Sequence, residues 1–377
     1  MSMIRNEFEA VIAGAVLCCI FGCGPTDGSK EFEQGKEAYG LRDLGKAEAL
    51  FSKSVTAAPQ DADRLLYLAR TELELGDIAK AQDAVGRAAA LSSDSDVRLL
   101  SAQVAWHVKD YDAAAAGFSA VAADSGLEPS VRAQGWAGLG VVEMTRDNHH
   151  LARIAFLRAI RLDRKNAAAW YHLGLLYRDG FGYLEAALEQ FEIFVRLEKE
   201  ANLRVQKVQR TVIPALKESI TRAAAERPGV SKRNSSACAT SISTAEAALK
   251  KGNVKAAREA YQQALAADPL SYPAALGLAK AWERTDATKA GQTKAFESYK
   301  TACALRPSAV STFLAAASLA TRLGFTLQSV EIYSRAVAAN PTSLEALDGL
   351  IRSLRKSGGK AKVADAYQAY RLSLGKK

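Results

Sequence analysis

The stretch that decides the fold lies at residues 170–191. It reads WYHLGLLY at its start (170–177) and ALEQF at its end (187–191). In both parts the apolar residues are three or four positions apart, which places them on one face of a helix. A small residue, Gly174 in the first part or Ala187 in the second, lets two helices approach closely, and an aromatic ring one turn later fills the space beside it. The stretch therefore predicts a pair of packed helices joined by a turn.

The same pattern recurs along the chain. Prolines close several of the units, and two of them, Pro307 and Pro341, are 34 residues apart. Proline stops a helix because it lacks an amide donor and disfavours helix in the residue before it. A small residue followed four positions later by a large one is found at Ala47/Phe51, Ala114/Phe118, Ala152/Phe156, Ala257/Tyr261 and Ala295/Tyr299, with weaker copies at Ala81/Val85, Ser329/Tyr333 and Val363/Tyr367.

The pattern Trp-x2-Leu-Gly-x2-Tyr followed by Ala-x3-Phe resembles the tetratricopeptide repeat (TPR) signature. This resemblance implies an all-α protein, a right-handed TPR superhelix (α-solenoid) with about nine helix-turn-helix repeats in two arrays. The composition agrees, because the chain has 73 alanines and only 9 prolines, and alanine is the best helix former. The predicted repeats are 28–61, 62–94, 95–128, 133–166, 167–201, 238–271, 272–309, 310–343 and 344–377.

The middle of the chain interrupts the repeats. Val205, Val208, Val212 and Leu216 recur at helical spacing, which predicts a helix that caps the fifth repeat; Pro214 either kinks it or begins a second helix. The insertions at 179–182 and 286–292 predict surface loops. The predicted organisation is a signal peptide (1–22), a tether (23–30), array one (31–197), a capping helix and basic linker (198–237) and array two (238–377).

The amino terminus predicts a targeting segment. Residues 10–21 form a 12-residue apolar run, which is too short to span a bilayer because a spanning helix needs about 20 residues. The sequence Ile-Phe-Gly before Cys23 resembles a bacterial lipoprotein signal, and the resemblance implies cleavage before Cys23 and attachment of lipid to it. Gly24, in place of Asp, favours the outer membrane over the inner one. An uncleaved or ordinarily cleaved leader is the alternative.

The rest of the sequence shows no motif for catalysis, for a cofactor or for a metal ion. The two cysteines of the mature chain, Cys238 and Cys303, lie 65 residues apart without a CxxC motif, so we expect both to be small core residues. We predict that the protein is not an enzyme. Nucleic acid is also an improbable partner for a lipid-anchored secreted protein.

The resemblance places function in the concave groove, which the first helices of TPR arrays line and where segments of other proteins bind. Carried over position by position, the main groove residues are Arg70, Trp106, Tyr171, Arg178, Lys250, Lys280, Arg322, Arg352 and Arg355. Two segments are strongly basic: 199–233 has nine basic and three acidic residues, and 349–377 has eight basic and one acidic. They either meet acidic partners or anionic lipid headgroups, or form a solvated face that keeps the ends of the arrays soluble.

Two functions remain open at this point. The first is a lipid-anchored scaffold of the bacterial cell envelope that binds other proteins and supports assembly or secretion of an envelope complex. The second is an envelope protein that binds a glycan or small ligand, with hydrolytic activity in the groove; the carboxylates it would need, Glu246, Glu283 and Asp348, are one per repeat. The final helix has no helix after it, so we also expect Tyr367, Tyr370 and Leu374 to be partly exposed and to offer a face for a homodimer or for docking.

Overall fold

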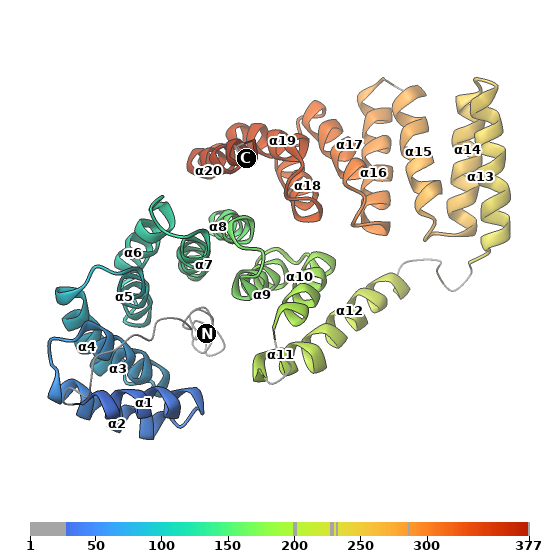
Figure 1. Cartoon of the computed structure of the whole chain (residues 1–377). Helices are drawn as coiled ribbons and strands as arrows, with labels where there is room; N and C mark the ends of the chain where they lie inside the picture. Colours follow the sequence, from blue (N-terminus) through green and yellow to red (C-terminus); the bar gives the residue numbers. More distant parts are fainter. Residues whose placement is uncertain (1–27, 199–201, 227–229, 231–232, 286, 376–377) are drawn as a thin grey trace. The chain divides into compact units, whose positions relative to one another are not determined.

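The computed structural model describes residues 28–198, 202–226, 230, 233–285 and 287–375. Every regular element over these residues is a helix, so the prediction of an all-α helical-repeat fold is confirmed. The chain divides into two compact units, with the boundary between Leu176 and Tyr177. In Figure 1 the helices within each unit follow one another as successive pairs.

The first unit contains four complete helix pairs and the first helix of a fifth. Each helix packs against the one that follows it, and the first helices of successive pairs also touch. The pairs fall inside the predicted repeat windows, except that α7 begins at Pro129, ahead of the window 133–166. The helices are α1 (Ser29–Gly40), α2 (Leu44–Ala57), α3 (Ala62–Leu75), α4 (Ile78–Leu91), α5 (Ser95–His107), α6 (Tyr111–Ala123), α7 (Pro129–Thr145), α8 (His149–Leu162) and α9 (Ala167–Leu175).

The second unit begins with a π-helical turn, η2 (Leu176–Phe181), and ends with four helix pairs. Helix α10 (Leu184–Leu197) follows η2. A further helical stretch then precedes the four pairs; it consists of α11 (Leu203–Lys207), the π-helical turn η3 (Val208–Val212) and α12 (Ile213–Ala225). The four pairs are α13 (Ser235–Lys250) with α14 (Val254–Ala267), α15 (Tyr272–Thr285) with α16 (Lys289–Leu305), α17 (Val310–Arg322) with α18 (Thr326–Ala339), and α19 (Leu344–Lys356) with α20 (Ala361–Leu374).

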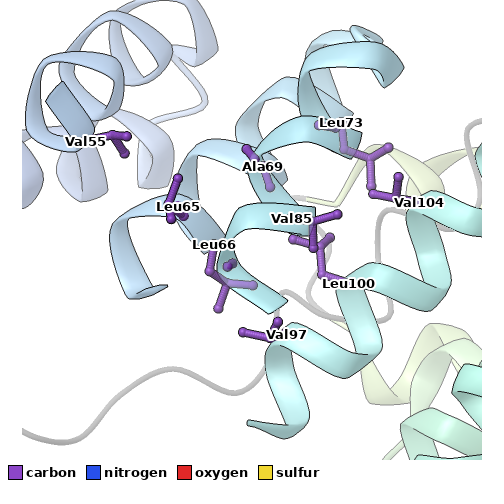
Figure 2. Close-up of a cluster of buried hydrophobic side chains, with 12 residues drawn as sticks. Val55, Leu65, Leu66, Ala69, Leu73, Val85, Val97, Leu100 and Val104 are labelled. Carbon is purple, nitrogen blue, oxygen red and sulfur yellow. The ribbon is translucent and has the colours of Figure 1, made fainter. Parts of the chain in front are cut away.

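Aliphatic side chains from neighbouring repeats form a continuous core. Figure 2 shows one such cluster, in which Leu65 and Ala69 of α3 lie between Val55 of α2 and Val85 of α4, and Leu100 of α5 closes the far side. These five side chains are 0–5% exposed. The core therefore extends from one repeat into the next, as stacking of incomplete units requires.

Glycines set the closest approaches between helices. A Cβ added at Gly140 would lie 2.4 Å from the ring of Phe156 in the same repeat, and one added at Gly277 would lie 2.4 Å from the ring of Tyr261 in the preceding repeat. Phe156 is completely buried and Tyr261 is 5% exposed. In these repeats the small residue is a glycine whose backbone contacts an aromatic ring on a neighbouring helix.

The first helix of a repeat ends on a residue with left-handed backbone. Gly76 (φ 85°) has this role after α3, and Lys109 (φ 66°) has it after α5. The amide of the next residue then donates to a carbonyl in the last turn of the helix, from Asp77 to Glu72 and from Asp110 to Ala105, each at 2.9 Å. This is the hydrogen bond by which a left-handed residue ends a helix and reverses the chain.

Two predictions about irregular segments need correction. The expected loop at 179–182 is wrong for Asp179, Gly180 and Phe181, because the insertion widens the end of α9 into the π-helical turn η2. A 2.7 Å hydrogen bond from the Tyr183 amide to the Tyr177 carbonyl closes this turn. The expected loop at 286–292 is too long, since α16 begins at Lys289; Asp286 lies outside the described residues.

Pro214 does not begin a separate helix. The backbone is right-handed helical at Val208, Val212 and Ile213, so α11, η3 and α12 follow one another without a break, and the π-helical turn η3 widens the helix directly before the proline. Helix α12 packs against α10, and the Lys217 ammonium lies 3.0 Å from the Glu192 carboxylate. The helix therefore covers α10, as a capping helix would.

The expected exposure of the last helix is wrong for its two tyrosines, whereas Leu374 is half-buried. Tyr367 is completely buried and Tyr370 is 2% exposed. Tyr367 occupies the aromatic position of a second helix, so its ring faces into the repeat, where α20 packs against α19. The homodimer through this helix thus loses the exposed tyrosines on which we based it.

Candidate functional site

The first helices of successive repeats lie side by side. In the first unit α3 packs against α5, α5 against α7 and α7 against α9; in the second unit α13 packs against α15, and α17 against α19. The first helices thus form a surface in each unit, which we call the first-helix face; in the second unit α15 and α17 are joined on it by the ion pair between Glu283 and Arg322. The predicted groove residues other than Arg178, which lies in η2, are all on first helices.

In the first unit two predicted groove residues join neighbouring repeats. Arg70 of α3 is 8% exposed, and its Nη2 donates to Asp96 Oδ2 of α5 at 2.9 Å. Trp106 of α5 is 6% exposed, and its Nε1 donates to Thr145 Oγ1 of α7 at 3.1 Å. Both side chains therefore fix the spacing of first helices. Their polar atoms are engaged in these hydrogen bonds and are not free to bind a partner.

The other two predicted residues at this end of the array have different surroundings. Tyr171 of α9 is buried and its ring meets His172 edge to face. Arg178 lies in η2, where its Nε and Nη2 donate to Asp179 at 2.6 and 2.7 Å. The charge of the Arg178 guanidinium is therefore neutralised by the neighbouring Asp179 carboxylate.

In the second unit Glu283 organises the first-helix face. Its Oε1 accepts from Arg322 Nη2 of α17 at 2.5 Å, and its Oε2 accepts from the Tyr299 hydroxyl at 2.8 Å. Burial raises the pKa of Tyr299, and the Glu283 carboxylate raises it further, so the phenol stays protonated and continues to donate. The predicted groove residue Arg322 is thus tied to α15 by an ion pair.

A hollow of about 210 Å³ opens beside this network, between α13 and α15. Its apolar lining comes from Leu249, Ala281 and the Tyr261 ring, which lies over Gly277. Lys280 stands at its rim and is exposed. The hollow can hold an apolar side chain while a cation stands at its mouth.

Lys250 and Lys280 are both exposed and make no ion pair among the described residues. Sequence reasoning missed a third cation of this kind, Arg284, which lines the same hollow and is also exposed. The signal was present in the sequence, because Arg284 follows Lys250 by 34 residues, the length of one repeat.

The last repeat carries the remaining predicted residues. Arg355 Nη2 lies 3.2 Å from Asp365 Oδ1 of α20, whereas Arg352 lies beside the buried Tyr333. Burial raises the pKa of Tyr333 and the Arg352 guanidinium partly offsets that rise. Asp348 is held by Arg371, with 2.9 Å between Arg371 Nη2 and Asp348 Oδ2.

Two of the three carboxylates considered for hydrolysis are therefore held by other side chains: Glu283 by Arg322 and Tyr299, and Asp348 by Arg371. Over the described residues no three or more His, Cys, Asp or Glu side chains are placed to hold a metal ion. Cys238 and Cys303 are both unpaired and buried, as predicted. None of the described helices is sufficiently long and apolar to cross a membrane.

Comparison with known families finds matches to the tetratricopeptide repeat in both units, at residues 32–96, 66–129 and 243–309. A comparison with curated proteins finds no match. Similar solved structures include PilW, described as a widely conserved type IV pilus biogenesis factor, at 15% identity over 67% of this chain and 98% of that chain, with a TM-score of 0.41. PilF of Pseudomonas aeruginosa is similar at 15% identity over 66% and 95%, with a TM-score of 0.40. The yeast Sti1 TPR2AB domain complex is similar at 12% over 91% and 98%, with a TM-score of 0.27. These are likenesses of helical repeats.

Proposed function

The chain carries tetratricopeptide repeats in both of its units, and from this premise we propose that it is a lipid-anchored scaffold of the bacterial cell envelope that binds segments of other proteins on its first-helix faces. The observation that carries the proposal is the alignment of first helices, α3 beside α5 beside α7 and α13 beside α15. Stacked repeats create extended binding surfaces of this kind.

The hollow between α13 and α15 supports the same proposal. It combines an apolar lining with exposed cations at its rim, which suits a side chain of a protein partner better than a hydrolysed substrate. Catalysis by two carboxylates needs both of them in one site, whereas Glu283 and Asp348 lie on different helices and are each held by an arginine. The scaffold is therefore the better-supported function.

The anchor is proposed from the sequence around Cys23, which lies outside the described residues. With several acyl chains attached, the protein would stay firmly bound to the membrane, since each buried methylene contributes about 0.8 kcal/mol. We place it at the periplasmic face of the outer membrane, where it would support assembly or secretion of an envelope complex. Mass spectrometry of the mature amino terminus tests the anchor: a lipid-modified Cys23 is expected, and an unmodified one contradicts it.

Site-directed photo-cross-linking in cells tests the binding face. A photoreactive amino acid at Ser318, which is exposed on the first helix α17, should give a discrete cross-linked protein. The matched control is Gln263, which is exposed on the second helix α14, and it should give none. Equal labelling from both positions, or none from Ser318, would count against a partner on the first-helix face.

A further inference from the structure

The second unit has a column of cations that the first unit lacks. The first helices α13, α17 and α19 end on Lys250, Arg322 and Lys356, and Arg284 is the last residue but one of α15. All four side chains are exposed. We call them the basic ladder, because each repeat of the second unit contributes one rung at the same place in its first helix.

The corresponding residues of the first unit are not basic in this way. Helices α1, α5 and α7 end on Gly40, His107 and Thr145, and Glu74 is the last residue but one of α3. Glu74 also accepts hydrogen bonds from Tyr39 and Arg42, so it is already satisfied. The fold of a first helix therefore does not require a cation at this position.

The helix dipole gives no general reason for the ladder either. Cations favour the last turn of any helix, by roughly 0.3–1 kcal/mol. In the second unit, however, the second helices α14, α16 and α18 have no basic residue in their last turn. The second helix α20 has Arg371 there, but this guanidinium is paired with Asp348. A basic residue in the last turn thus recurs on all four first helices of the pairs, where it borders the first-helix face, and on one of their four second helices.

Most of the ladder is electrostatically unpaired. Lys250, Arg284 and Lys356 make no ion pair among the described residues, whereas Arg322 is paired with Glu283. Glu246, one turn before Lys250, is the other carboxylate on this part of the face. Burial raises the pKa of the Tyr261 hydroxyl, and the Glu246 carboxylate raises it further. The face therefore keeps a surplus of positive charge.

We propose that the first-helix face of the second unit binds an acidic, extended peptide segment whose carboxylates recur at every third residue. This inference rests on the proposed scaffold function and names the chemistry of the partner. Packed helices lie roughly 8–10 Å apart, and a polyproline II segment rises about 3.1 Å per residue with three residues per turn. Every third side chain then projects from the same side at about 9 Å intervals, which matches the rungs on α13 and α15 and those on α17 and α19, whose first helices pack together.

The hollow between α13 and α15 supplies an apolar anchor beside the ladder. Arg284 lines it together with Leu249 and the Tyr261 ring, so a carboxylate on the ladder and an apolar side chain of the same segment can bind next to each other. A charged surface alone would attract any anion. The adjoining hollow favours a peptide over a lipid headgroup or a nucleic acid.

The test is fluorescence anisotropy with two labelled peptides and the full mature chain. The first peptide has Asp at every third position, separated by Pro and Leu; the second has the same composition with the Asp residues adjacent. The ladder variant is Lys250→Gln, Arg284→Gln and Lys356→Gln together, and Arg322 is kept because it holds Glu283. The matched control is Lys255→Gln, Lys289→Gln and Lys362→Gln, which removes three exposed cations from the second helices α14, α16 and α20.

We expect the spaced peptide to bind more tightly than the clustered one at low ionic strength. A surface ion pair changes affinity by a factor of about two to five, so the ladder variant should lose at least about tenfold and the control variant little. Added salt should reduce the difference, because the rungs are exposed and screened. Circular dichroism and urea unfolding of each variant establish that all three chains are folded.

Three results would overturn the proposal: equal loss in the ladder and control variants, equal binding of the two peptides, or ladder-dependent binding to phosphatidylglycerol vesicles without binding of the spaced peptide. The cross-linking at Ser318 separates this proposal from the scaffold function. If the ladder variant still cross-links its partner as the natural chain does, the scaffold stands and the acidic segment is excluded.

Discussion

Replacing Gly349 by alanine should destabilise the last repeats of the second unit. An added Cβ would lie 2.1 Å from Cε1, 2.3 Å from Cζ and 2.6 Å from Cδ1 of Tyr333, whereas carbon atoms in contact are about 3.5–4.0 Å apart. The ring has little room to retreat, because Tyr333 is 6% exposed. Overpacking of this kind costs about 1–3 kcal/mol, and alanine returns about 0.5–1 kcal/mol through its better helix propensity. The net loss should be about 1–2 kcal/mol.

Gly86 is the matched control. It lies inside α4 with no atom within 4 Å of an added Cβ, so Gly86→Ala should stabilise by about 0.5–1 kcal/mol. The two substitutions are chemically identical, and the packing of a ring decides the sign. Urea unfolding measures both, and amide hydrogen exchange should locate the loss in α18 and α19 for Gly349→Ala.

A second substitution isolates the ring as the cause. Tyr333→Leu removes Cε1 and Cζ, the two atoms closest to the added Cβ, so in that background Gly349→Ala should lose most of its cost and approach the effect of Gly86→Ala. Such non-additivity is the signature of residues in contact. If Gly349→Ala stabilises the natural chain as Gly86→Ala does, the seating of rings on glycines is not what holds neighbouring repeats at their spacing.

Three further predictions concern single interactions. The Arg233 guanidinium donates to the Asp268 carboxylate at 2.7 and 2.9 Å and lowers the pKa of that carboxyl. The stability that ionised Asp268 contributes is therefore fully present above its unfolded pKa of about 3.9, and it is lost as the pH falls through the lower folded pKa. The difference in unfolding free energy between the natural chain and Asp268→Asn should shrink in acid. Ser329 Oγ lies 2.7 Å from both Thr321 Oγ1 and Ser353 Oγ, so Ser329→Ala should cost about 1–3 kcal/mol in thermal unfolding, and adding Ser353→Ala should cost less than the sum of the two single changes. Lys109 has a left-handed backbone (φ 66°), which is unfavourable for a side chain by about 1–2 kcal/mol, so Lys109→Gly should raise the melting temperature and Lys109→Val should lower it.

The helix pairs could be predicted from sequence because their signal is local and repeated. A small residue four positions before an aromatic one, as in Ala152 and Phe156, requires a helical backbone to place both on one face. The structure buries both side chains completely. Each copy of the pattern also predicts its partner helix, so one well-preserved repeat was enough to assign the others.

The π-helical turns and the state of the last helix could not be predicted in this way. An insertion such as that near Asp179 can leave the helix as a loop or widen its last turn, and the choice depends on tertiary packing rather than on local propensity. The burial of Tyr370 likewise depends on contacts distant in sequence. Trp136 and Trp170 are only half-buried: the Arg158 guanidinium lies over the Trp136 ring, and Trp170 Nε1 donates to the Arg164 carbonyl.

The candidate site was harder to predict than the fold because one repeat position serves two purposes. A polar residue on a first helix can bind a partner, or it can hold the next repeat, as Arg70 does through Asp96 and Arg322 through Glu283. Sequence position alone does not separate these roles, since both need a side chain at the same edge of the helix. Comparing the same position across repeats does separate these roles. Lys250 and Arg284 make no ion pair with a neighbouring repeat among the described residues. A basic residue nevertheless recurs at this position in all four helix pairs of the second unit, and no lysine or arginine stands there in the four complete pairs of the first. At Arg322 this charge also holds the preceding repeat, whereas at Lys250, Arg284 and Lys356 it makes no ion pair among the described residues, and for these three rungs a ligand that extends along the repeats supplies the missing partner.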